Sequence, residues 1–191
     1  IMRLDHIAYR VKDRYKTYDF FRKAFGYSLG TSFEIEFGDG THADCLALLP
    51  PEDRPVDTRE WDVLLADKPG DVNNEEVDFH SYHTPPEIFV SDGGIGSIVG
   101  DWVAERGGVG GIHHIAYQVD DVAATMKQWK EEGYAEFYTD EPIFCENPRL
   151  VQVFTKPSEL TGVIYELITR EGNGFCQKSV RELMESTDNK E

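Results

Sequence analysis

The 191-residue sequence has few cysteines, little basic charge and no long apolar runs. Its three cysteines, Cys45, Cys145 and Cys176, are odd in number and lack the close spacing of a zinc knuckle or a redox pair. This usage is typical of a reducing compartment and predicts a cytoplasmic protein. No stretch approaches the roughly 18 apolar residues of a membrane span, and the amino terminus has no signal-peptide core. We therefore expect a soluble chain that does not partner a membrane.

Basic residues are outnumbered, with 19 Lys and Arg against 36 Asp and Glu and a formal net charge of -17. Such a chain offers no basic face to displace the counterions of a nucleic acid, so nucleic-acid binding is excluded. Many of the acids lie between about 50 and 85, a stretch that we interpret as a solvated insertion. Hydrophobic residues make up 40% of the chain, which is enough for a proper core.

One segment occurs twice. Residues 4–13, LDHIAYRVKD, return 108 positions later as residues 112–121, IHHIAYQVDD, and six of the ten positions are identical. Behind each copy comes a helical stretch that ends in Gly-Tyr, at Gly26 and at Gly133. A fixed repeat of this kind indicates a duplicated supersecondary unit. Each copy carries a histidine, so the two copies can offer two imidazoles to one shared metal.

The repeated segment alternates as a strand does, and its first copy places on one face Leu4, His6, Ala8 and Arg10. Asp13 is a predicted helix cap with Gly26 as the stop, while Asp120 or Asp121 and Gly133 do the same in the second copy. Further strands are predicted at 28–37, 42–49, 87–90, 149–155 and 162–169. A linking helix is expected over 97–106, followed by a flexible glycine joint at 107–111.

These elements predict an α+β protein made of two tandem units, each a strand, a helix and then several strands. We place the first module at 1–106, with the acidic insertion and the linking helix, and the second at 107–191. A capping box, Ser179 to Glu182, predicts that a final helix begins near Ser179. The glycine joint leads into a strand instead of a helix, which excludes a dinucleotide-binding loop.

A carboxylate interrupts the apolar strand at 162–168, where Glu166 shares a face with Ile164 and Ile168. A buried, unpaired carboxylate is costly, so it needs a cation, a proton or strong hydrogen bonds. His6 and His114 are its natural partners, since two imidazoles and one carboxylate form the facial triad typical of non-haem Fe(II) oxygenases. A single strand histidine is more often a hydrogen-bonded core or surface residue. Glu87 is either a fourth ligand or a surface glutamate after two prolines.

The arrangement resembles the vicinal oxygen chelate superfamily, also called the glyoxalase/bleomycin resistance/dioxygenase superfamily. Its second module is most similar to the catalytic half of 4-hydroxyphenylpyruvate dioxygenase. The similarity runs in order from about Gly107 to Met184 and rests on the segments Gly110–Ala116, Leu150–Pro157, Tyr165–Arg170 and Gly174–Phe175. In addition, Leu4–Val11 resembles that family's first ligand strand.

The resemblance implies paired βαβββ modules that curl into a half-open barrel around a divalent metal. It also implies that His6, His114 and Glu166 are the metal ligands, and that Gln152 is a catalytic hydrogen-bonding group on the substrate side. Phe154 and Phe175 would then form walls of the pocket. The chain departs from the family in having His113 in place of a glutamine, which makes it a second catalytic candidate. Ile164 and Val180 replace phenylalanines, and we count Ile164 among the substrate-binding residues.

We therefore expect a metal-dependent dioxygenase that uses Fe(II) to act on a 2-oxo acid or a similar small chelating substrate. Zn, Mn, Ni and Co are alternative metals. The principal rival is a glyoxalase-like lyase, isomerase or epimerase with a redox-inert metal. A fourth ligand would favour that rival, so Glu87 separates the two. A metal-free small-molecule binding protein is the third alternative, and a homodimer is an open alternative for the assembly.

Overall fold

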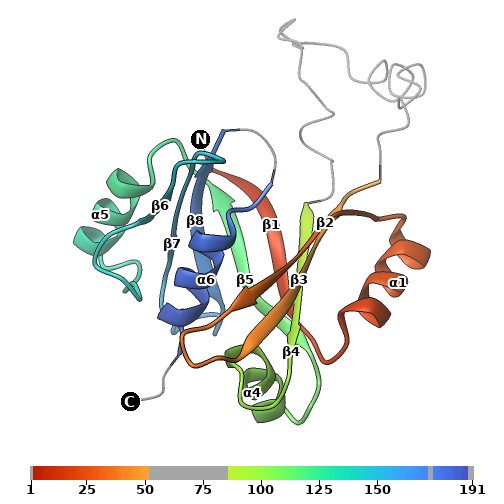
Figure 1. The fold of residues 1–191 in the computed structure, drawn as a ribbon. Coiled ribbons are helices and arrows are strands. Elements are labelled where there is room, and N and C mark those ends of the chain that lie inside the picture. Colours follow the sequence, from red (N-terminus) through yellow and green to blue (C-terminus); the bar gives the residue numbers. More distant parts are fainter. Residues whose placement is uncertain (1, 52–85, 172–173, 189–191) are drawn as a thin grey trace, which may run out of the picture.

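The computed structural model describes residues 2–51, 86–171 and 174–188. The predicted acidic insertion, 50–85, therefore lies almost entirely outside the described residues. Twelve elements are described in Figure 1, eight of them strands of one continuous sheet. The α+β fold class is confirmed.

The strand bounds are β1 Arg3–Arg10, β2 Ser28–Glu36, β3 His42–Leu49, β4 Glu87–Gly93, β5 Gly111–Gln118, β6 Ile143–Cys145, β7 Leu150–Phe154 and β8 Ile164–Arg170. They are ordered β2-β3-β4-β1-β5-β8-β7-β6. The two strands that carry the repeated segment, β1 and β5, pair antiparallel at the centre. Each also pairs in parallel with the last strand of its own unit, β1 with β4 and β5 with β8. The order is therefore the same on both sides of the central pair.

The described residues include four helices that lie against this sheet: α1 Arg14–Phe25, α4 Ile98–Glu105, α5 Val122–Glu132 and α6 Gln177–Ser186. Asp13 and Asp121 cap α1 and α5, because each carboxylate accepts a hydrogen bond from a backbone N–H three residues on. Gly26 and Gly133 end these helices in the left-handed conformation, with φ of 77° and 70°. Both sets of predicted helix signals are confirmed.

The sheet curls into a half-open barrel, and α6 crosses its open side (Figure 1). This helix contacts β2 at one end of the sheet and both β6 and β7 at the other. Val180 and Met184 of α6 pack into the apolar cluster of the inner face around Phe89, and Leu183 packs against Phe154. The inner face of the barrel is thus closed by side chains of α6.

The predicted start of the last helix was wrong by two residues. The helix begins at Gln177, after Cys176, and has no side-chain cap. The Ser179 hydroxyl, which we expected to cap it, donates to the backbone oxygen of Cys176 and to Oε1 of Gln152. The reason is a tertiary contact. The buried amide of Gln152 lies beside the first turn and accepts the hydrogen bond of the Ser179 hydroxyl, which a capping box would use instead. The short strand β6 was also missed, since three residues carry no readable periodicity.

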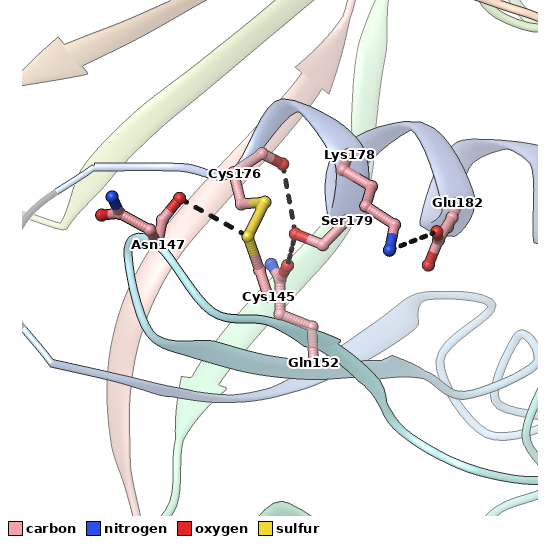
Figure 2. The surroundings of a disulfide bond; sticks show 7 residues. All are labelled: Cys145, Asn147, Gln152, Cys176, Lys178, Ser179 and Glu182. Atoms are coloured by element: carbon pink, nitrogen blue, oxygen red, sulfur yellow. Dashed lines mark hydrogen bonds and ion pairs between the residues drawn. A yellow bond between two sulfur atoms is a disulfide. The ribbon is translucent and has the colours of Figure 1, made fainter.

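The cysteine pattern indicated no disulfide, but the structure pairs Cys145 with Cys176 across 31 positions (Figure 2). This bond joins the end of β6 to the residue before α6. Cys45 is free and fully buried. The cytoplasmic location therefore stays a prediction that the cysteines no longer support. Among the described helices, none is long and apolar enough to cross a membrane.

Candidate metal centre

His6, His114 and Glu166 meet inside the barrel. The two Nε2 atoms of His6 and His114 lie 3.3 Å apart. Oε2 of Glu166 lies 3.3 Å from Nε2 of His6 and 3.0 Å from Nε2 of His114. All three residues are buried, with exposed fractions of 1%, 8% and 1% in chain order. We refer to these three residues as the triad.

The spacing of the triad fits one metal ion. Ligands of a first-row metal bind at about 2.1 Å, so neighbouring ligands around an octahedral ion are about 3.0 Å apart. The observed separations of 3.0 to 3.3 Å match this value. Three ligand atoms on one face of such an ion leave the opposite positions for substrate or oxygen. The residues present therefore fit a divalent metal held by two imidazoles and one carboxylate.

The central strands bring the triad together through their register. Ala116 on β5 lies opposite His6 on β1 and, on its other side, opposite Glu166 on β8. His114 is two residues away on β5 and so shares the face of Ala116. Because Ala116 is small and fully buried, the longer side chains of its neighbours can meet above it.

Two β-bulges orient the triad histidines. The β1–β5 register skips Asp5 on β1 and His113 on β5, and each skipped residue directly precedes a triad histidine. Asp5 Oδ1 lies 2.7 Å from Nδ1 of His6, and His113 Nδ1 lies 2.8 Å from Nδ1 of His114. Each bulged residue thus engages the nitrogen that faces away from the metal position, which fixes the ring and turns Nε2 inward. Strict alternation had placed Asp5 on the opposite face, so sequence reasoning missed its role.

The charges around the triad also favour a cation. Burial lowers the pKa of His6, but Glu166 and Asp5 outweigh this effect and raise it to about 9. Burial would raise the pKa of Glu166, yet His6 and His114 hold it far below its usual range. Burial and the charge of Arg10 lower the pKa of His113 well below its usual value, so this residue is neutral. The site therefore keeps its carboxylate ionised at all ordinary pH values.

Gln152 is held by protein groups at both ends of its amide. Its Nε2 donates to Oε1 of Glu166. Its Oε1 accepts the hydrogen bond from Ser179 of α6, which Figure 2 shows. The resemblance implied a group on the substrate side. In this structure the amide instead fixes the second oxygen of Glu166, and it links that carboxylate to the helix across the barrel.

Glu87 lies opposite His6 in the β1–β4 register, but its carboxylate forms an ion pair with Arg170, Oε2 to Nη2 at 3.0 Å, and does not join the triad. The same guanidinium binds Asp5 at 3.0 Å. On β4 the position that corresponds to Glu166 on β8 is Phe89, because Phe89 pairs with the residue two places after His6. Phe89 is apolar and 4% exposed. Among the described residues, the triad therefore has no fourth protein ligand from β4.

A small cavity adjoins the triad. Phe154 stacks near His114 and Phe175 near His6, with ring centroids 4.6 and 5.0 Å apart, so both line it as predicted. Ile164 does not line the cavity but packs behind it against Phe154. The cavity volume is about 30 Å³, which is room for one or two waters. Ligand sites usually measure about 300 Å³ or more, so the cavity has to widen before it can hold a substrate.

We expect Asp5→Asn to weaken metal binding about 10- to 100-fold, the usual cost of losing a group that orients a histidine ligand. The reason is that the neutral amide oxygen of Asn is a weaker acceptor for Nδ1–H of His6 than a carboxylate, and it no longer forms the ion pair with Arg170. Competition between the protein and a chelator for Zn(II) measures the change. Asp13→Asn is the matched control, because Asn also caps α1. Equal affinities in both variants would contradict this role for Asp5.

Comparison with known proteins places the chain in a family. Residues 3–140 match the model of the Glyoxalase/Bleomycin resistance protein/Dioxygenase superfamily. An ethylmalonyl-CoA/methylmalonyl-CoA epimerase from Cereibacter sphaeroides is 35% identical over 63 residues, 33% of this chain and 46% of that protein. The chain thus spans about half of the relative that it matches.

Two solved structures share the fold. A triple mutant of 4-hydroxymandelate synthase from Streptomyces coelicolor has a TM-score of 0.69 and 17% identity, over 97% of this chain and 53% of that one. Methylmalonyl-CoA epimerase from Mycobacterium tuberculosis has a TM-score of 0.58 and 16% identity, over 88% of each chain. From the family match over residues 3–140 and this fold, the chain belongs to the Glyoxalase/Bleomycin resistance protein/Dioxygenase superfamily.

Proposed function

We propose that this chain is a non-haem Fe(II)-dependent dioxygenase that acts on a 2-oxo acid or a similar small chelating molecule. The observation that carries the proposal is the three-ligand triad, with Phe89 where a fourth ligand would lie. Two imidazoles and one carboxylate with open positions are the ligand set typical of Fe(II) oxygenases. The similarity to 4-hydroxymandelate synthase is in fold and agrees with this assignment.

When bound, Fe(II) would supply the positions at which a chelating substrate and O₂ are held together. The chain supplies the rest of the site. Asp5 and His113 fix the two histidine rings, and Gln152 fixes the free oxygen of Glu166. Phe154 and Phe175 line the cavity beside the triad, and side chains of α6 close it toward bulk solvent. Excluding water protects reactive oxygen chemistry from side reactions.

The second candidate is an epimerase that uses a redox-inert metal, which the local identity to the Cereibacter sphaeroides protein favours. Such an enzyme needs a group that moves a proton at the substrate. Of the described residues that line the cavity, Glu166 is the sole carboxylate, and it belongs to the triad. Glu87 is engaged by Arg170, and His113 by His114. This lack of a free carboxylate base in the described lining supports the dioxygenase over the epimerase.

Anaerobic loading with Fe(II), followed by measurement of oxygen uptake, tests the proposal. We expect uptake that depends on one or more members of a panel of 2-oxo acids, and none with Zn(II) in place of iron. The matched test for the rival is exchange of the α-proton of methylmalonyl-CoA in deuterated water with the Co(II) form. Proton exchange without oxygen uptake would overturn the dioxygenase and favour the epimerase.

A further inference from the structure

Arg10 is a buried cation inside the barrel that belongs neither to the triad nor to an ion pair among the described residues. It lies on the inner face of β1, four residues after His6, and is 3% exposed. It lines the same cavity as the triad. Because a strand rises about 3.3 Å per residue, its Cα is about 13 Å from that of His6. The guanidinium itself lies near Trp102, whose ring also contacts His113, so it faces the His113 side of the cavity.

In the part of the chain that the structure describes, Arg10 forms no ion pair with a carboxylate, and the charge of Asp188 acts on it only from farther away. Its guanidinium donates a 3.2 Å hydrogen bond to Oγ1 of Thr187, and its carbon Cζ lies 5.8 Å from the ring of Trp102. A second cation, the guanidinium of Arg106, lies over the same ring, with its carbon Cζ 3.7 Å from the centroid of the Trp102 ring. A chain with net charge -17 thus buries a positive group and adds another positive group beside it. A buried cation with a second cation beside it favours the binding of an anionic ligand.

Burial and the neighbouring Arg106 lower the pKa of Arg10 to about 9, so the group is still charged at neutral pH. A buried charge without a partner costs several kcal/mol. Ser91 lies opposite Arg10 in the β1–β4 register, is also buried, and adds its hydroxyl to the cavity lining. Guanidinium and hydroxyl together are donors suited to a carboxylate, which arginine can bind through two parallel hydrogen bonds.

We propose that Arg10 and Ser91 form a carboxylate subsite, and that the substrate is a dicarboxylate with one end at the triad and its second carboxylate at Arg10. This inference rests on the proposed function in that it takes the cavity as the substrate pocket. The second carboxylate of the substrate would form an ion pair with the Arg10 guanidinium and neutralise its charge.

The test compares matched acids on the Co(II)-loaded protein, in which binding is read from the visible spectrum and needs no turnover. The probes are 2-oxoglutarate, 2-oxoadipate and 2-oxopimelate, each against the 2-oxo monocarboxylate of the same carbon number. We expect at least one dicarboxylate to bind about 30-fold tighter than its partner or more, since removing one side of a buried charge pair costs that much. Equal binding of every pair, or binding of no acid, would overturn the proposal.

Variants then assign the preference to the guanidinium. Arg10→Met should remove the preference for the dicarboxylate and change monocarboxylate binding less than about threefold, while Arg10→Lys should retain part of it. Arg3→Met, on the exposed end of the same strand, is the matched control and should change nothing. Thr187→Val removes the hydrogen bond from Arg10 to Thr187 but keeps the cation, so it should keep the preference. The same loss in Thr187→Val as in Arg10→Met would show that Arg10 only ties α6 to β1.

These outcomes are separate from those of the proposed function. Oxygen uptake by the Fe(II) form tests the dioxygenase, whereas the cobalt titration tests only which acids bind. A dicarboxylate preference that depends on Arg10, without oxygen uptake on any acid, would keep the subsite and reject the oxygenase. Oxygen uptake on monocarboxylates that is unchanged in Arg10→Met would keep the oxygenase and reject the subsite.

Discussion

Glu166→Ala should reduce metal affinity by more than about 100-fold, beyond the usual cost of losing an outer hydrogen-bond partner. The variant removes one of three ligand atoms that lie 3.0 to 3.3 Å apart, together with the only negative charge in the triad. The two imidazoles that remain carry no negative charge to neutralise a divalent cation. Metal content after dialysis and chelator competition measure the effect, and oxygen uptake should fall with it.

Glu87→Ala is the matched control for that variant, because it removes a carboxylate of the same size from a neighbouring position on the sheet. Glu87 binds Arg170 and takes no part in the triad. We expect the metal content of this variant to stay close to that of the unchanged protein, with a loss of less than about tenfold in affinity. Equal metal loss in both variants would mean that Glu87 moves into a four-ligand site, and it would favour the epimerase.

Metal affinity should rise about tenfold per pH unit between pH 7 and 9 and level off above that. In the metal-free protein the pKa of His6 is about 9, because Glu166 and Asp5 outweigh the effect of burial. Below that pH the ring carries a proton, and a metal binds only the neutral imidazole. Each unit of pH below the pKa therefore costs a factor of ten. Glu166 contributes no slope, since its pKa lies far below this range.

Zn(II) titrations in chelator buffers at several pH values measure this slope. Calorimetry in buffers of different ionisation enthalpy should show about one proton released per metal at pH 7.5. Asp5→Asn removes one group that raises the pKa of His6, so its plateau should begin at lower pH. An affinity that is constant from pH 7 to 9, with no proton release, would contradict the protonation state assigned to His6.

Most of the local structure could be predicted from the sequence, because local signals decide it. Asp13 and Gly26 set both ends of α1 through a side-chain cap and a left-handed stop. The repeated strand with its central histidine predicted that His6 and His114 share one site. The carboxylate in an apolar strand then predicted Glu166 as their partner, because such a group needs a cation or strong hydrogen bonds.

The features that the sequence could not predict depend on register and on contacts between distant residues. The β-bulges at Asp5 and His113 interrupt the alternation of side chains along the strand. The prediction of which face each strand residue lies on depends on that alternation. The position of Glu87 beside Arg170 depends on how β4 pairs with β1, a pairing across an 80-residue gap. The same pairing puts Phe89 where a fourth ligand would lie. A one-residue change in register moves every side chain to the other face, and sequence periodicity does not specify the partner strand.

The sequence by itself thus determined the class of fold, the capped helices and the identity of the three triad residues. Tertiary structure alone decided that their ligand atoms lie 3.0 to 3.3 Å apart. It also decided that Asp5 hydrogen-bonds to His6 and that Gln152 hydrogen-bonds to Glu166. It also decided that Arg10 ends in the same cavity without a carboxylate partner among the described residues. The physical reason is range: caps and periodicity act over a few residues, whereas the site joins side chains from β1, β5, β7, β8 and α6.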